Sequence, residues 1–151
     1  MGRVGRRAGD ADRTVEPTDL LGSWRFDRRI IGRDGGARRF GRVTGTLDLV
    51  TDDGAVGWHE RGALTWDGRR LDVYRDLRIE RRDGGWVVCF EDGREFHPWR
   101  LATPVVHPCR ADTYCGLLAV DRERTRLRVV WDVSGPAKRH RLFTRATRTS
   151  S

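Results

Sequence analysis

Cysteine, lysine and long apolar runs are scarce in this sequence. Its 151 residues include three cysteines and no stretch of about 18 apolar residues, which excludes a helix that spans a membrane. An odd number of cysteines at irregular spacing does not predict a disulfide framework, and without a CxxC pair structural zinc is not indicated. We therefore expect three reduced thiols, most of them buried.

The first residues, from Met1 to Asp12, are rich in arginine and glycine and lack the apolar core of a secretory signal. The default expectation is a cytoplasmic protein with no membrane partner. A chain of this length is typical of one domain with a real core. We interpret residues 1–16 as a disordered arm, residues 17–148 as the domain and residues 149–151 as a tail.

Lys138 is the only lysine, so arginine supplies nearly all of the positive charge, a bias that is common in chains from GC-rich genomes. The formal net charge is +8, and the last fifteen residues contribute five of those charges, from Lys138, Arg139, Arg141, Arg145 and Arg148. Residues 17–136 carry an excess of only two. This distribution along the chain disfavours nucleic acid as a partner, although the basic C-terminal segment can still meet phosphates or acidic partners.

No long segment has helical periodicity, and turn signals recur instead. Asp-Gly pairs stand at residues 34–35, 53–54, 67–68, 83–84 and 92–93, and Asp-Gly supplies the positive φ that tight hairpin turns need. Between the turns, apolar and polar residues alternate with the period of a strand. This pattern predicts strands near 22–31, 37–50, 55–65, 69–80, 85–91, 95–101, 104–110, 112–120, 125–133 and 139–147, after a helical turn at 17–21.

Consecutive strands joined by short turns form an up-and-down meander, and closing the meander into a barrel removes its exposed edges. The fold class is therefore predicted as all-β, an antiparallel barrel of about eight to ten strands, wide enough for one small ligand. A β-sandwich is the alternative.

The alternation also predicts which side chains face inward. Trp24 and Arg28 share a face of the first strand, Trp58 and Glu60 share a face of the third, and Trp131 belongs to an apolar row of the ninth. Arg28 and Glu60 are the charged members of otherwise apolar rows. A buried charge must be paired, so these two side chains either pair with one another or extend to the rim of the barrel; alternatively, they line a polar cavity.

Three blocks of sequence resemble a known family. They are Phe90–His97 (FEDGREFH), His107–Gly116 (HPCRADTYCG) and Trp131–Lys138 (WDVSGPAK). Together they resemble the bacterial and fungal proteins grouped as domain of unknown function 6314, over a span from Leu20 to about Arg148. Gly22-Ser23-Trp24 is also similar to the Gly-x-Trp that opens lipocalin barrels, where the tryptophan plugs the closed end. The resemblance implies a calycin-like barrel and implies no activity.

The densest group of reactive side chains is His107, Cys109, Asp112 and Tyr114. A histidine that an aspartate orients can shuttle protons near neutral pH, and the tyrosine can donate or orient. The same residues can instead form a structural network that fixes a corner between two strands. Both interpretations stay open.

Other roles are weighed for this group and its neighbours. His97, His107, Cys109 and Asp112 are metal-ligand types in no standard spacing, and either histidine is a candidate axial ligand for haem. Cys109 beside His107 is a candidate nucleophile. Lys138 can hold an anionic group over the barrel mouth.

We interpret the protein first as a small-molecule binding barrel for an apolar or aromatic ligand. The walls would come from Trp24, Trp58, Trp131 and Tyr114, with polar contacts from Arg28, Glu60, His97, Cys109 and Lys138. The alternative is a cofactor-independent isomerase, cyclase or dehydratase that uses His107, Asp112 and Tyr114. Haem-binding barrel and basic nucleic-acid-binding module are further alternatives. We predict no cofactor and no metal, and the sequence leaves the oligomeric state open.

Overall fold

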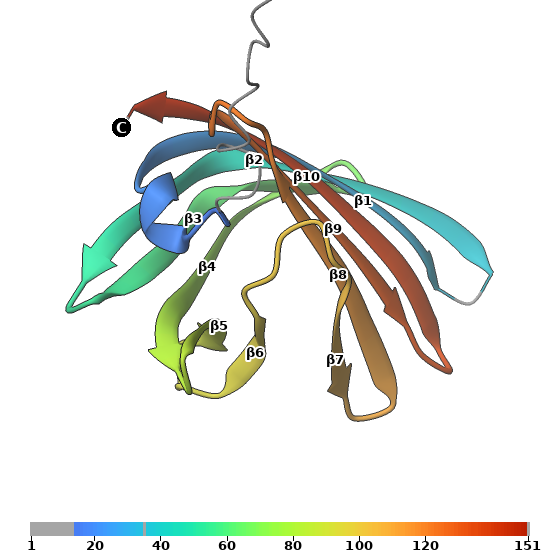
Figure 1. The fold of residues 1–151 in the computed structure, drawn as a ribbon. Coiled ribbons are helices and arrows are strands. Elements are labelled where there is room, and N and C mark those ends of the chain that lie inside the picture. The colour runs from blue at the N-terminus through green and yellow to red at the C-terminus, as the bar shows by residue number, and fades with distance from the viewer. Residues whose placement is uncertain (1–13, 35, 151) are drawn as a thin grey trace, which may run out of the picture.

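The computed structural model describes residues 14–34 and 36–150, and it consists of a single antiparallel sheet that curls into a nearly closed barrel (Figure 1). The sheet has ten strands in the order β6-β5-β4-β3-β2-β1-β10-β9-β8-β7. Each strand pairs with its neighbour in sequence, except that β10 closes onto β1 and that β6 and β7 form the two ends. The predicted barrel is confirmed, and the β-sandwich is wrong because all strands belong to one sheet.

The elements follow the predicted turns closely. The short helical turn at residues 17–21 is confirmed as a 3-10 helix. The elements are η1 (Pro17–Leu20), β1 (Gly22–Asp34), β2 (Ala37–Asp52), β3 (Ala55–Trp66), β4 (Arg69–Arg82), β5 (Gly85–Phe90), β6 (Glu95–Pro98), β7 (Val105–Cys109), β8 (Asp112–Val120), β9 (Arg126–Ser134) and β10 (Lys138–Ser150).

Three of the five Asp-Gly turns have the expected backbone; at Asp92-Gly93 only the glycine has positive φ, and Gly35 lies outside the described residues. Asp53 and Gly54 have φ of 48° and 80°, and Asp67-Gly68 and Asp83-Gly84 have nearly the same values. Positive φ at both central residues defines the tight hairpin turn whose twist matches that of the strands. These turns fix the register from β2 to β5, and with it the face that each side chain takes.

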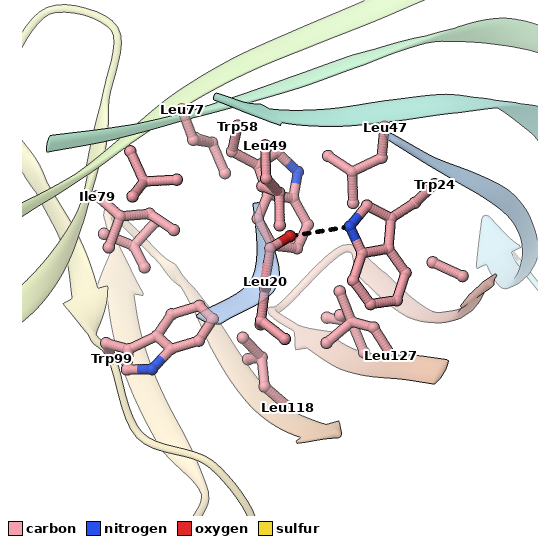
Figure 2. Close-up of a cluster of buried hydrophobic side chains, with 14 of the residues drawn as sticks. Leu20, Trp24, Leu47, Leu49, Trp58, Leu77, Ile79, Trp99, Leu118 and Leu127 are labelled. Carbon is pink, nitrogen blue, oxygen red and sulfur yellow. Dashed lines mark hydrogen bonds between the residues drawn. The ribbon is translucent and has the colours of Figure 1, made fainter. Parts of the chain in front are cut away.

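One end of the barrel is plugged by the 3-10 helix and the first tryptophan (Figure 2). Trp24 is fully buried, and its Nε1 donates a hydrogen bond of 3.1 Å to the carbonyl oxygen of Leu20. Trp99 packs beside them and donates through Nε1 to the carbonyl oxygen of Val15 at 3.0 Å. Trp24 therefore has the plug position that the lipocalin resemblance implies.

Some details differ from the sequence-based expectations. Cys89 is buried, but Cys109 is exposed at the end of β7, and Cys115 is exposed because it lies on the outer face of β8, opposite Asp132. β6 ends at Pro98, short of the predicted 101. The amide of Trp99 still donates to the carbonyl oxygen of Trp86 at 2.9 Å, but the chain then leaves β5 for β8, where the amide of Ala102 donates to the carbonyl oxygen of Leu118 at 2.7 Å. Strand β10 runs to Ser150 through its pairing with β1, so it extends past the predicted domain end at 148.

The last residues of the predicted N-terminal arm contact the barrel. Val15 and Glu16 contact the barrel through Trp99 and Arg81, and residues 1–13 of the arm lie outside the described part of the chain. Among the described residues no helix has the length and apolar character needed to cross a bilayer.

Candidate functional site

The barrel lumen holds a group of inward-facing polar side chains beside aromatic rings. A cavity of about 20 Å³ lies among them, which is room for about one water molecule. Its walls come from six strands and the loop after β6. The lining residues are Trp58, Arg75, Leu77, Val88, Phe96, His97, Trp99, Leu118, Val129 and Trp131.

A charged network closes one side of this cavity. Glu60 Oε1 accepts three hydrogen bonds: from Arg28 Nη2 at 2.9 Å, from Arg75 Nη2 at 2.7 Å and from the indole Nε1 of Trp58 at 2.9 Å. Arg28 Nε also donates to the Thr144 hydroxyl at 2.8 Å. The side chains of Glu60 and Arg28 are 5% and 12% exposed. The predicted pairing of Arg28 with Glu60 is confirmed.

The ionised form of Glu60 is strongly favoured. Burial alone would raise the pKa of this carboxyl, but the charges of Arg75 and Arg28 and their hydrogen bonds outweigh it and lower the pKa to about 2. Glu60 is therefore a carboxylate at neutral pH, and it holds the two guanidinium groups in place.

Arg75 is the member of this network that the sequence analysis missed. It lies on the inward face of β4, between Val73 and Leu77, in a row whose other members are apolar. Strict alternation from Leu71 to Ile79 places residue 75 on the same face. The inward position of Arg75 could therefore have been predicted from the two-residue period of the strand. Two guanidinium groups against one carboxylate leave one excess positive charge, and the buried Nε of Arg75 has no hydrogen-bond partner among the described residues.

The cavity lies near the seam of the barrel, where β6 and β7 face each other without pairing (Figure 1). Aromatic side chains bridge this seam in place of backbone hydrogen bonds. The Phe96 ring stacks on Phe90 at 4.6 Å and on Trp131 at 5.0 Å, and it meets the His107 ring edge-on at 5.2 Å. Between β6 and β7 the seam is therefore held by side-chain packing, while the segment after β6 is tied to β8 by the hydrogen bond of 2.7 Å from the Ala102 amide to the carbonyl oxygen of Leu118.

His97 contributes a neutral imidazole to the cavity wall. Its Nδ1 lies 2.8 Å from the carbonyl oxygen of Pro98, and because a carbonyl only accepts, Nδ1 carries the proton. Burial lowers the pKa of His97, with Arg75 and His107 adding to the effect against the raising influence of that hydrogen bond. At neutral pH the Nε2 atom is therefore an acceptor.

The structure separates the predicted acid–base group into two parts. His107 and Tyr114 are cross-strand partners with rings 6.3 Å apart, and His107 belongs to the seam cluster. Asp112 instead pairs with Lys138 at 3.0 Å, near the hairpin that joins β7 and β8. No hydrogen bond joins His107 to Asp112 in the described part of the chain. The catalytic roles of His107, Asp112 and Tyr114 stay predictions.

The remaining candidates lie outside the cavity wall. Trp24 belongs to the plugged end, Cys109 is exposed at the end of β7, and Lys138 is ion-paired at the start of β10. The hydrogen bond to Asp112 raises the pKa of Lys138. The described residues bring together no group of three metal-ligating side chains, and the cavity is too small for a porphyrin among the side chains as they stand.

The architecture defines a ten-stranded antiparallel barrel with a charged and aromatic lumen. A family model described as "Family of unknown function (DUF6314)" matches residues 20–148, and the chain belongs to this family. The match covers the whole ten-stranded sheet except the last two residues of β10. No curated protein matches the chain.

Proposed function

We propose that the barrel binds a small apolar or aromatic molecule in its lumen, at a site centred on the cavity. The observation that supports this most is the Arg28–Glu60–Arg75 network, which is centred on a buried carboxylate and faces rings of Trp58, Trp131 and Phe96. Apolar walls with a few convergent polar groups are typical of small-molecule sites. A core built only for stability gains little from buried ion pairs, since apolar residues of similar volume serve as well or better.

The ligand must displace side chains to enter, because the closed lumen holds about one water molecule. The seam between β6 and β7 gives the route, since no ladder joins these two strands and β6 has only four residues. Rotation of Phe96 and His107 away from each other opens this side of the lumen without loss of a strand pair.

The polar groups suggest one acidic function on the ligand. The excess positive charge and the unpartnered Nε of Arg75 suit a carboxylate or similar monoanion, while the neutral Nε2 of His97 accepts a hydrogen bond from a hydroxyl or amide. The ligand we propose is therefore an aromatic or apolar monoacid.

The test is a titration with phenylnaphthylamine, a neutral probe that fluoresces in apolar surroundings. We expect saturable binding to the wild type and at least a tenfold loss in Val129→Phe, because the new ring fills the cavity. Val130→Phe is the matched control, since its side chain lies on the opposite face of β9. Equal affinity in both variants, or no binding to the wild type, would contradict the proposal.

The acidic group is tested separately with anilinonaphthalene sulfonate, which adds one negative charge to the same skeleton. The wild type should prefer the sulfonate over the neutral probe, and Arg75→Met should abolish that preference while it keeps the neutral probe bound. Arg94→Met, in an exposed turn, is the control. An unchanged preference in Arg75→Met would remove the acidic group from the proposal and leave the lumen site standing.

A further inference from the structure

Arginine side chains gather on the outer face of β9, β10, β1 and β2, which run side by side in the sheet (Figure 1). We call this surface the arginine face. Counting the described residues that point outward on these four strands, it has ten arginines and four aspartates. They are Arg25, Arg29, Arg33, Arg38, Arg42, Arg126, Arg128, Arg139, Arg141 and Arg145, with Asp27, Asp48, Asp52 and Asp132.

The outer face of the neighbouring strands β3 and β4 has nearly equal numbers of positive and negative side chains. The outward side chains of β3 and β4 include four arginines and three acidic residues, and most of these form ion pairs, such as Arg61 with Asp76 and Arg82 with Glu80. The ten arginines and four aspartates of the arginine face leave an excess of six positive charges, against one on β3 and β4. The positive charge is thus concentrated on one side of the sheet.

The strand register sets like charges directly opposite each other on the arginine face. Arg33 pairs across the sheet with Arg38 on one side and with Arg139 on the other. Arg29 lies opposite Arg42, and Arg145 lies opposite Arg128. Like charges in such positions destabilise a sheet, so the arrangement opposes folding.

Few of these arginines have an anionic partner. Arg42 pairs with Asp27 and Arg141 with Asp132. Within the described residues Arg33 pairs with no carboxylate, while Arg29 and Arg145 share Asp27 with Arg42: their charges help to lower its pKa, but neither forms an ion pair with it. Unpaired cations on one surface create a field that attracts a polyanion.

One exposed aromatic ring, one half-buried ring and a shallow depression accompany the charge. Phe40 is 64% exposed on β2, and the guanidinium of Arg145 lies 5.1 Å from the ring centre of Phe143. A depression of about 540 Å³ crosses β10, β1 and β2, with Arg25, Arg42 and Arg145 in its walls. Cationic grooves with exposed rings are how sheet surfaces hold single strands, by phosphate contacts and base stacking.

We infer that the arginine face binds single-stranded nucleic acid. The inference is independent of the lumen site, which lies on the inner side of the same sheet. It departs from the expectation drawn from charge along the chain, because pairing of β10 with β1 brings the C-terminal arginines beside those of β1 and β2.

The test uses fluorescence anisotropy of the full chain with a labelled mixed-sequence oligonucleotide, made as single-stranded RNA, single-stranded DNA and DNA duplex. The face variant is Arg29→Gln with Arg33→Gln and Arg145→Gln. The control variant is Arg94→Gln with Arg100→Gln and Arg110→Gln, which removes the same charge from exposed sites outside the face.

We expect the wild type to bind a single strand more tightly than the duplex, with affinity that falls steeply with salt. The face variant should bind roughly tenfold more weakly, and its salt slope should fall by about 2, since each single-strand phosphate contact contributes about 0.7. Phe40→Ser should weaken single-strand binding with an unchanged slope, because stacking carries no charge. The control variant should stay within about twofold of the wild type.

Folding is measured on the same variants. The face variant should melt at the same temperature as the wild type or higher, because it relieves like-charge pairs. Equal losses of oligonucleotide affinity in the face and control variants would overturn the inference, and so would absence of oligonucleotide binding to the wild type at low salt. Binding to phosphatidylserine vesicles without binding to any oligonucleotide would also overturn it and assign the face to a membrane surface.

Discussion

Replacement of Glu60 by glutamine removes the anion that holds two arginines inside the barrel. The folded-state pKa of about 2 lies well below the ordinary value of 4.5, and at about 1.4 kcal/mol per pKa unit this depression corresponds to about 3 kcal/mol of stability at pH 7. The glutamine side chain would keep the shape and one acceptor for Trp58, so the loss reports the charge rather than a cavity.

The contribution of Glu60 to the free energy of unfolding depends on pH, and the sign of this dependence follows from its pKa. Because folding lowers the pKa of Glu60, its contribution is complete above the unfolded value near 4.5 and is lost as the pH falls toward 2. The stability difference between wild type and Glu60→Gln should therefore shrink to less than about half between pH 7 and about pH 3.

Urea unfolding followed by tryptophan fluorescence measures this difference. Asp132→Asn is the control, since it breaks an exposed pair with Arg141 and should cost less than about 1 kcal/mol. A second variant that combines Glu60→Gln with Arg75→Met should recover part of the loss, because it removes one of the two unpaired cations. A Glu60→Gln variant as stable as the control at pH 7, or a difference that does not change with pH, would refute the reasoning.

Two further predictions concern the backbone of the barrel. Amides of β6 and β7 should exchange with deuterium faster than those of β1 and β10, because the seam is held by side chains such as Phe96; uniform protection around the barrel would contradict this. Gly45→Ala should lower stability by more than about 2 kcal/mol in chemical unfolding, because its Cβ would collide with the carbonyl oxygen of Arg61, whereas Gly85→Ala meets no atom and should cost less.

Most of the fold could be predicted from the sequence because its determinants are local. The Asp-Gly turns at 53–54, 67–68 and 83–84 each fix one hairpin, and period-two alternation assigns faces within each strand. The shared inward face of Trp58 and Glu60 followed from this, and the pairing of Glu60 with Arg28 was one of the alternatives it left open. β6 was predicted too long because its end is set by where the chain crosses from β5 to β8, which alternation does not show.

The site was only partly predictable, because it depends on contacts between distant strands. Asp112 lies near His107 in sequence, yet its carboxylate turns to Lys138, which β10 brings alongside. Arg75 was overlooked because it stands among the apolar inward residues of β4, from Leu71 to Ile79. The arginine face was overlooked because charge was counted along the chain, whereas the sheet adds it across four strands.

The most direct test of the lumen site is a heteronuclear NMR titration of the tryptophan indole N–H signals with phenylnaphthylamine. The account predicts that the signals of Trp58, Trp99 and Trp131, which line the cavity, shift to saturation. The signals of Trp66 and Trp86, which lie outside its walls, should stay in place. Shifts confined to Trp66 and Trp86, or no shift at all, would contradict a binding site in the lumen.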